Sequence, residues 1–252
     1  MNLHRRFPST FFIIGRSVRA MAGTATLALA LCGVAPSAGA QSLAYVDAVF
    51  AVEINGQPTE GRNRLDVSRN GEHYHVDFVL DHWMVSVRQH ADFGMQACAV
   101  RPQAYEDVSK RPFAEESAQT LKFDWNAGVA HYRNAEGAKD FPLDDKAYDP
   151  ISLFFEARCG LMAGEEDFTY PVIRKGSLRT QHYRVVDRQP VETGMGTFEA
   201  LVVERVRKNR KRQTRLYVAP ELDYLLVRIE HQESKLLKVA VTLQHMDYRL
   251  QP

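Results

Sequence analysis

The sequence predicts an all-β fold with a minor α component. We expect a single antiparallel curved sheet or barrel-like domain of about a dozen strands, with one short helix packed on its concave side. Apolar and polar residues alternate through most of the chain, as they do in half-buried strands. Short turn segments separate these runs. One stretch, residues 149–159, instead has the start signals and apolar spacing of a helix.

The first 40 residues have the features of a secretory signal peptide. Arginines give a positively charged start, and TLALALCGVA (26–35) is a short apolar run. Ala38 and Ala40 supply the small residues that a signal peptidase requires, so we predict cleavage after Ala40. Lipidation of Cys32 is disfavoured, because a lipoprotein signal requires a small residue before the cysteine. The predicted location is the periplasm, with residues 41–252 forming one β-rich domain.

The composition of the mature chain disfavours some classes of partner. Cleavage removes four of the 32 Lys and Arg and none of the 31 Asp and Glu, which leaves a net charge of about −3. A nucleic-acid partner is therefore not expected. No apolar run after the signal peptide is long enough to span a bilayer, so we expect a soluble mature protein without a transmembrane segment.

Alternation begins directly after the signal peptide. Every second residue is apolar over 44–54 and again over 73–80, which predicts two strands with one buried face each. Segments 55–61 and 69–73 contain Asn-Gly and are predicted to be turns. Residues 85–100 are predicted to contain further strand structure.

The rest of the chain continues as strands and loops. Residues 101–113 are polar, contain proline and are predicted to form a loop. A hairpin is expected from 120–125 and 129–134, with its turn over 126–128. Four further strands with short connections predict an antiparallel meander: 197–207, 213–219, 224–231 and 236–248.

Residues 149–159 (DPISLFFEARC) predict the helix. Asp149 is a preferred N-cap, because its side chain can accept a hydrogen bond from an unpaired backbone N–H. Pro150 suits the first helical position, and Gly160 is expected to end the helix in a left-handed conformation. A two-turn helix is not stable alone. We therefore expect it to pack on the concave face of the sheet as a plug or lid.

Four segments together resemble a bacterial exported family, domain of unknown function 3108. The resemblance implies a strand-rich periplasmic protein, similar in fold to curved sheets that carry lipoproteins or lipids across the periplasm. The family offers no catalytic residues to carry over to this sequence. Leu226 departs from the family pattern, which has proline there. The segments are FDWNAGVAHY (123–132), FPLDDKAYDPISLFFEAR (141–158), VVDRQPVETGMGTFEALVVER (185–205) and RLYVAPELDYLLVRIE (215–230).

One candidate metal site lies on a predicted strand. His73, His75 and Asp77 alternate and therefore share a face, and their side chains could hold Zn²⁺ or another divalent ion. The protein would then be a periplasmic hydrolase or metal-dependent enzyme. We favour the alternative of solvated side chains, because the intervening residues are apolar and take the buried face. We expect no catalytic residue: Ser152 lacks the G-x-S-x-G context of a hydrolase nucleophile.

Aromatic residues are the candidates for a ligand site. An incompletely filled curved sheet would leave a cavity for an apolar or amphipathic envelope component, and an envelope protein is the alternative partner. Structural pairing with a buried acid is the favoured alternative for Arg158. The candidate ligand-binding residues are Trp83, Trp125, Phe154, Phe155 and Arg158.

Residues 205–215 (RVRKNRKRQTR) form a basic segment at a predicted hairpin tip. Such a tip could dock on anionic surfaces of the envelope, as an assembly factor would. The favoured alternative is a solvated hairpin whose charge prevents edge-to-edge pairing. The candidate anion-binding residues are Arg207, Lys208, Arg210, Lys211 and Arg212.

Two cysteines, Cys98 and Cys159, remain after cleavage. Export to an oxidising compartment permits a disulfide between them, and two buried thiols are the alternative. Two cysteines without further spaced ligands do not make a zinc motif. Taken together, the sequence predicts a non-catalytic exported protein that binds an envelope component and has no cofactor.

Overall fold

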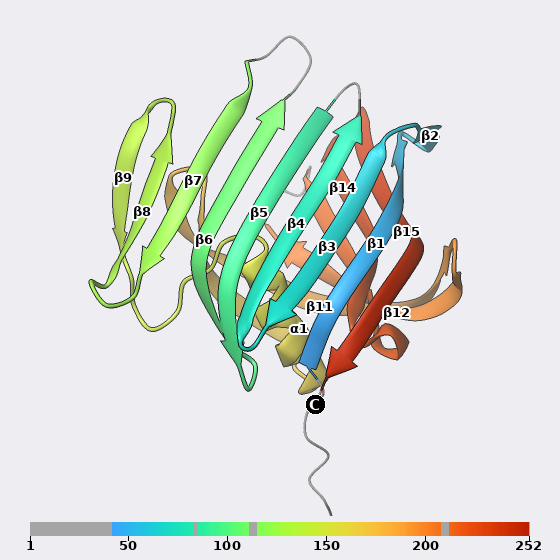
Figure 1. Cartoon of the computed structure of the whole chain (residues 1–252). Helices are drawn as coiled ribbons and strands as arrows, with labels where there is room; N and C mark the ends of the chain where they lie inside the picture. Colours follow the sequence, from blue (N-terminus) through green and yellow to red (C-terminus); the bar gives the residue numbers. More distant parts are fainter. Residues whose placement is uncertain (1–41, 83–84, 111–114, 208–211, 252) are drawn as a thin grey trace, which may run out of the picture. The chain divides into compact units, whose positions relative to one another are not determined.

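The computed structural model describes residues 42–82, 85–110, 115–207 and 212–251. Within these residues, 15 strands form one curved, open sheet in which neighbouring strands are antiparallel. One α-helix, α1 (Ser152–Met162), packs against this sheet (Figure 1). The predicted fold class is therefore confirmed, with more strands than the predicted dozen.

Most consecutive strands along the chain are neighbours in the sheet. The strands before α1 are β1 (Ser42–Ile54), β2 (Gln57–Thr59), β3 (Arg62–Asn70), β4 (His73–His82), β5 (Val85–Gln96), β6 (Ala99–Lys110), β7 (Ser117–Asp124), β8 (Val129–Asn134) and β9 (Gly137–Pro142). The elements after α1 are β10 (Asp167–Arg174), β11 (Ser177–Thr193), β12 (Gly196–Val206), β13 (Gln213–Ala219), the 3₁₀ turn η1 (Pro220–Leu222), β14 (Leu225–Ser234) and β15 (Leu237–Gln251). Across the sheet the order is β10-β11-β12-β13-β14-β15-β1-β3-β4-β5-β6-β7-β8-β9, and β2 pairs with β1.

The first and last strands join the two halves of the sheet. In the β1–β15 ladder, Val46 lies opposite Tyr248 and Val52 lies opposite Val241 (Figure 1). Val46, Ala48 and Val52 are each about 1% exposed, so the predicted face of this strand is the buried one. The long-range ladder makes one continuous sheet from two sequential runs of hairpins.

The prediction of a loop over 101–113 is wrong for the described residues up to 110, which belong to β6. Val100, Tyr105 and Asp107 are buried on its inner face. Pro102 lies at a bulge, where the register against β5 shifts between Asp92 and Phe93. A bulge tolerates a residue without an N–H, which explains how this strand accommodates its proline.

The hairpin of β10 and β11 has no counterpart in the predicted elements. Val172 and Ile173 are buried on β10, but β11 places Arg179 and Gln181 at inward positions where the expected pattern has apolar residues. Polar inner residues weaken the alternation from which strands are predicted. This hairpin lines part of a cavity between α1 and the sheet, which is described below.

The helix lies where it was predicted, with shifted ends. The Asp149 carboxylate accepts hydrogen bonds from the backbone N–H of Ile151 (2.8 Å) and Ser152 (2.9 Å), which is a capping role. The prediction that Gly160 ends the helix is wrong. A Cβ at Gly160 would lie 2.7 Å from Phe168 Cε1, so this glycine permits close packing within the helix. Gly164, at φ +83°, has the left-handed conformation instead.

The two ends of the sheet approach each other without forming a ladder. Lys139 Nζ on β9 donates to the Gly176 carbonyl (3.3 Å), and the Lys175 N–H donates to Gln119 Oε1 (3.2 Å). The edge of β10 is partly covered, since Tyr148 N–H donates to the Pro171 carbonyl (3.0 Å). The sheet is therefore barrel-like but open.

The helix is fixed to the sheet by covalent and apolar contacts. A disulfide joins Cys159 on α1 to Cys98 in the β5–β6 turn. Phe155 packs on Phe93 with ring centroids 4.8 Å apart, and Phe93 stacks on Tyr74 at 5.2 Å. These contacts hold one side of α1 in place. No helix in the described part of the chain is long and apolar enough to cross a membrane.

Candidate functional site

A cavity of about 390 Å³, the inner cavity, lies between the start of α1 and the inner face of the sheet. Phe154 and Phe155 line it from the helix, and strands of both halves of the sheet line it from the other sides. Its wall is mainly apolar; typical contributors are Phe50, Leu65, Phe78, Leu216, Ile229 and Val241. The curvature of the sheet thus leaves a space that the side chains do not fill.

One end of the inner cavity is cationic. Arg174, Arg205 and Arg207 belong to its wall, and they also line an adjoining hollow of about 310 Å³, the arginine pocket. Lys175, Arg179 and Arg212 complete this pocket, together with Val172, Ser177 and Gln181. None of the described residues that line either space is acidic. The combined site is therefore amphipathic.

The arginines lie on adjacent strands whose inner faces meet at this end. Arg205 on β12 lies opposite Tyr183 on β11, and Arg207 follows two residues later on the same side. Burial lowers the pKa of Arg205, and the guanidinium groups of Arg207 and Arg174 lower it further. Burial likewise lowers the pKa of Arg207. The site therefore holds positive charge where water only partly solvates it.

A chain of polar contacts crosses the cavity wall beside Arg207. Thr214 Oγ1 lies 2.9 Å from His231 Nδ1, and His231 Nε2 lies 3.2 Å from Glu233 Oε2. Arg207 donates to Thr214 Oγ1 (3.3 Å). Thr214 and His231 lie directly opposite each other in the β13–β14 ladder, which brings a hydroxyl and an imidazole to the cationic end of the cavity.

Arg158 serves the helix rather than the inner cavity. Its side chain is 2% exposed, Nε donates to the Asp223 carbonyl (2.8 Å), and NH2 pairs with the Asp223 carboxylate. It lines a separate hollow of about 70 Å³ under α1. The contacts of Arg158 are therefore those of the favoured alternative, structural pairing with an acid, which is Asp223.

The aromatic residues that were candidates for ligand binding do not all lie at the inner cavity. Phe154 and Phe155 line the inner cavity, whereas Trp125 does not. Trp125 Nε1 instead donates to the Pro102 carbonyl (2.7 Å), and its ring carries Arg101 on one face at 4.7 Å. Trp83 lies outside the described residues.

The basic segment is described only at its two ends. Arg207 lies in the cavity wall, and Arg212 forms an ion pair with Glu233. Lys208, Arg210 and Lys211 lie outside the described residues. Sequence reasoning therefore found Arg207 and Arg212, but as surface charges rather than as parts of one pocket with Arg174.

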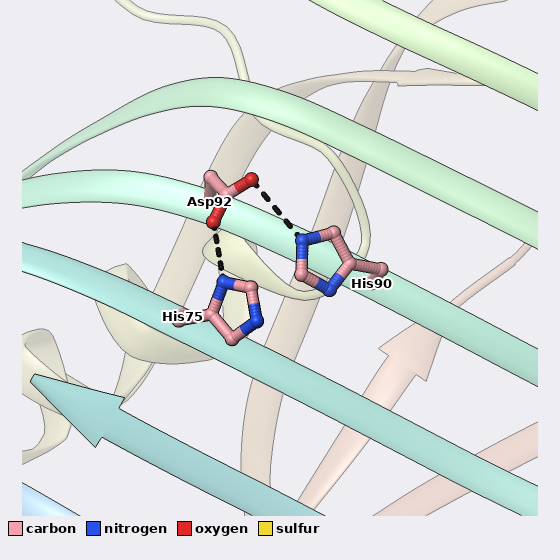
Figure 2. Close-up of side chains that lie close together, drawn as sticks. All are labelled: His75, His90 and Asp92. Atoms are coloured by element: carbon pink, nitrogen blue, oxygen red, sulfur yellow. Dashed lines mark hydrogen bonds and ion pairs between the residues drawn. The ribbon is translucent and has the colours of Figure 1, made fainter.

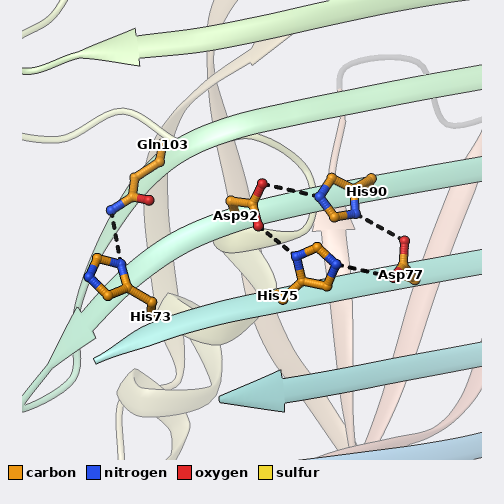
Figure 3. A network of polar contacts seen from close by, with 6 residues as sticks. All are labelled: His73, His75, Asp77, His90, Asp92 and Gln103. Atoms are coloured by element: carbon orange, nitrogen blue, oxygen red, sulfur yellow. Dashed lines mark hydrogen bonds and ion pairs between the residues drawn. The ribbon is translucent and has the colours of Figure 1, made fainter. Parts of the chain in front are cut away.

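Two of the three metal candidates, His75 and Asp77, belong to a ring of four side chains on the other face of the sheet. Figure 2 shows three of its members, and Figure 3 shows all four. His75 Nδ1 lies 2.7 Å from Asp92 Oδ1, and His90 Nε2 lies 3.1 Å from Asp92 Oδ2. Asp77 closes the ring, 2.9 Å from His90 Nδ1 and 3.5 Å from His75 Nε2. His73 stands apart and contacts Gln103 at 3.3 Å (Figure 3).

The β4–β5 register builds this His–Asp ring. Each strand carries a His-x-Asp sequence, and the two strands run antiparallel. Asp77 therefore lies opposite His90, and His75 lies opposite Asp92. The sequence analysis included His75 and Asp77 and missed His90 and Asp92. The available signal was the alternation of His90 with Asp92 in the next strand.

The ring is arranged as two ion pairs more readily than as a metal site. Ligand atoms of His75, His90 and Asp92 lie within 4.8 Å of one another, which is close enough for a shared cation. However, all four ring nitrogens face carboxylate oxygens of the same four side chains, so each nitrogen already has a polar partner. A metal ion would have to break these contacts and displace the proton of any ring nitrogen that it binds.

The ring predicts a pH-dependent stability. Burial alone would lower the pKa of His90, but hydrogen bonds to Asp77 and Asp92 outweigh it and raise that pKa. The stabilisation is therefore complete below the unfolded pKa of His and is lost as the pH rises through the folded pKa. We expect His90→Gln to lower the free energy of unfolding more at pH 5.5 than at pH 8, by at most about 1 kcal/mol because the ring is partly exposed.

Urea denaturation at the two pH values measures this difference. His131→Gln is the matched control, because it removes a single exposed contact to Asp140. An equal loss of stability for His90→Gln at both pH values would contradict the assignment of charge to the ring.

Comparison with known proteins gives a family and a fold. The family model described as "Protein of unknown function (DUF3108)" matches residues 49–235. A beta-barrel-like protein of domain of unknown function DUF1849 from Brucella abortus is similar in structure, with a TM-score of 0.51, 12% identity, and coverage of 82% of this chain and 98% of that one. A candidate lipoprotein from Parabacteroides distasonis aligns with a TM-score of 0.29 and 9% identity, over 81% of this chain and 95% of that one. Among curated proteins, none matches the sequence.

Proposed function

We propose a binding function for this chain, which belongs to the DUF3108 family of proteins of unknown function. It is a non-catalytic exported protein of the periplasm that holds an apolar or amphipathic component of the cell envelope. The observation that carries this proposal is the inner cavity between α1 and the sheet. Protein interiors are otherwise close-packed, with few voids larger than a water molecule.

The size and chemistry of the cavity fit a small ligand. Its volume of about 390 Å³ lies in the range of small-molecule sites. An apolar wall with a few polar groups at one end favours a ligand with an apolar body. Export is supported by the Cys98–Cys159 disulfide, because disulfides persist in oxidising compartments.

Two residues of the cavity wall, Thr214 and His231, belong to an arrangement that resembles a catalytic one. Thr214, His231 and Glu233 form a hydroxyl–imidazole–carboxylate chain, which is the connectivity of a hydrolytic triad. Thr214 lies in β13, however, and from Arg215 onwards this strand pairs with β12 and β14, so the backbone N–H groups that follow Thr214 are used in the ladders and are not free to form an oxyanion hole. We therefore favour binding. Hydrolysis of p-nitrophenyl laurate that is lost in Thr214→Val would contradict the non-catalytic assignment.

Filling the cavity is expected to abolish binding. Leu216→Trp places an indole in the wall between the inner cavity and the hollow under α1. We expect it to lower the amount of co-purified ligand by at least about tenfold, since the overpacked wall leaves no room for an apolar chain. Ligand extracted from protein purified from the periplasm is identified and quantified by mass spectrometry.

Leu178→Trp is the matched control, because Leu178 is 38% exposed and outside the cavity wall. Thermal melting of both variants separates loss of the cavity from loss of the fold. A wild-type protein that yields no ligand over repeated preparations, or only a bound protein partner, would overturn the proposal.

A further inference from the structure

We propose that the ligand of the inner cavity is an anionic amphiphile whose headgroup binds in the arginine pocket. This inference rests on the proposed binding function and specifies the class of ligand. The apolar chain would lie among the aliphatic and aromatic side chains near α1. The headgroup would lie where Arg174, Arg205 and Arg207 belong to both spaces.

The lining of the arginine pocket is strongly cationic. Six of its lining residues are Lys or Arg, and none of the described lining residues is acidic. Among the five arginines of the pocket, Arg212 alone forms an ion pair with a described residue, Glu233. The other four arginines therefore share one hollow without a carboxylate partner in the lining. A bound anion would supply the missing negative charge.

The guanidinium groups of Arg174, Arg179, Arg205 and Arg207 make few hydrogen bonds within the described part of the chain. The guanidinium groups of Arg174 and Arg179, at exposed positions, and of half-buried Arg205 make no hydrogen bond or ion pair with the described residues. Arg207 has one hydrogen bond, to Thr214 Oγ1 at 3.3 Å, and its Nε is buried without a partner. Partly buried donors without partners are unfavourable, and guanidinium groups are suited to bidentate contacts with phosphate or carboxylate.

A neutral donor also lies beside the arginines. Gln181 lines both spaces, and the Tyr183 hydroxyl donates to Gln181 Oε1 at 2.8 Å. That bond orients the Gln181 amide, whose NH₂ group remains able to donate. A fixed neutral donor beside charged ones is typical of a headgroup site.

The test compares two lipids that differ only by a phosphate group. Lauroyl lysophosphatidic acid and monolaurin have the same chain and glycerol, and only the first carries a phosphate. Both are titrated into delipidated mature protein by calorimetry below their critical micelle concentrations. We expect lysophosphatidic acid to bind at least about tenfold more tightly than monolaurin, and more weakly at high salt.

Variants then assign the difference to the pocket. Arg205→Gln is expected to weaken lysophosphatidic acid binding by about tenfold and to leave monolaurin binding unchanged. Arg179→Gln, at an exposed position, provides a second variant that does not affect the buried wall. Arg188→Gln is the control, because Arg188 is an exposed residue of the same strand that lines neither space.

The outcomes separate this inference from the proposed function. Equal affinity for the two lipids, unchanged by either pocket variant, overturns the anionic headgroup and leaves the binding function standing. Binding of neither lipid overturns both. Inorganic phosphate that binds as tightly as lysophosphatidic acid also overturns the inference, because the apolar chain would then contribute nothing.

Discussion

Replacing Asp223 by Asn is expected to lower the free energy of unfolding by about 3 kcal/mol, because it leaves the Arg158 guanidinium buried without a counter-charge. The Arg158 side chain is 2% exposed and the Asp223 side chain is 17% exposed, so water replaces the lost partner poorly. Burial lowers the pKa of Arg158 to about 10, and the group remains charged at neutral pH. The folded Asp223→Asn variant would therefore bury a charged Arg158 guanidinium without a carboxylate partner.

Asparagine is chosen because it isolates the charge. Asp223 has φ +55°, in the left-handed region that Asn tolerates better than most residues. The backbone carbonyl of residue 223, which accepts from Arg158 Nε at 2.8 Å, is unchanged by the substitution. The loss should thus come from the carboxylate and not from a strained turn.

Urea denaturation at pH 7 measures the effect. Asp247→Asn is the control, since Asp247 is exposed on β15, and its effect should be within about 0.5 kcal/mol. The double variant Arg158→Met, Asp223→Asn should recover much of the lost stability, because the unpaired charge is removed. A fully stable Asp223→Asn protein would show that the pair does not hold α1 to the turn after η1.

The parts of the fold that could be predicted are those specified by neighbouring residues. Alternation gave the inner face of β1, and Asp149 with Pro150 gave the start of the helix. Local patterns do not specify partners, however. Arg158 and Asp223 are 65 residues apart, and their contact depends on how the whole sheet curves.

The candidate site was harder to predict because it departs from the pattern that identifies strands. The inner face of β11 carries Arg179 and Gln181 where a core strand would carry apolar residues. These polar positions made the β10–β11 hairpin difficult to recognise, and with it Arg174. Local rules are expected to fail at functional sites, which supports a ligand-binding role for this end of the cavity.

The His–Asp ring was missed for a different reason. Its members come from two strands that sequence analysis did identify, but their meeting depends on register. A shift of one residue between β4 and β5 would separate His75 from Asp92 and His90 from Asp77. Alternation gives the face on which a residue lies and leaves its neighbour across the ladder unspecified.

Removal of the disulfide is expected to have a larger effect than removal of any single surface contact. The Cys98–Cys159 bond closes a loop with a sequence separation of 61, which corresponds to about 4 kcal/mol in the chain-entropy model. Cys98 is exposed in the β5–β6 turn, so a reductant can reach it, whereas Cys159 is buried on α1. We therefore expect the Cys98→Ser, Cys159→Ser variant to unfold at a lower urea concentration than the oxidised wild type.

The disulfide also bears on the cavity, because it fixes the helix that forms one wall. Near the disulfide, a hydrogen bond also joins α1 to β6: the Glu156 carboxylate accepts from the Val100 N–H at 3.2 Å. With the disulfide gone, α1 should open more often, and bound ligand should dissociate faster even where the fold persists. The rate at which lysophosphatidic acid dissociates from oxidised and from reduced protein measures this effect. The Cys98→Ser, Cys159→Ser variant is the control for the reductant, because the reductant should not change its dissociation rate. Equal dissociation rates for the oxidised and reduced wild type would mean that the helix does not act as the lid of the cavity.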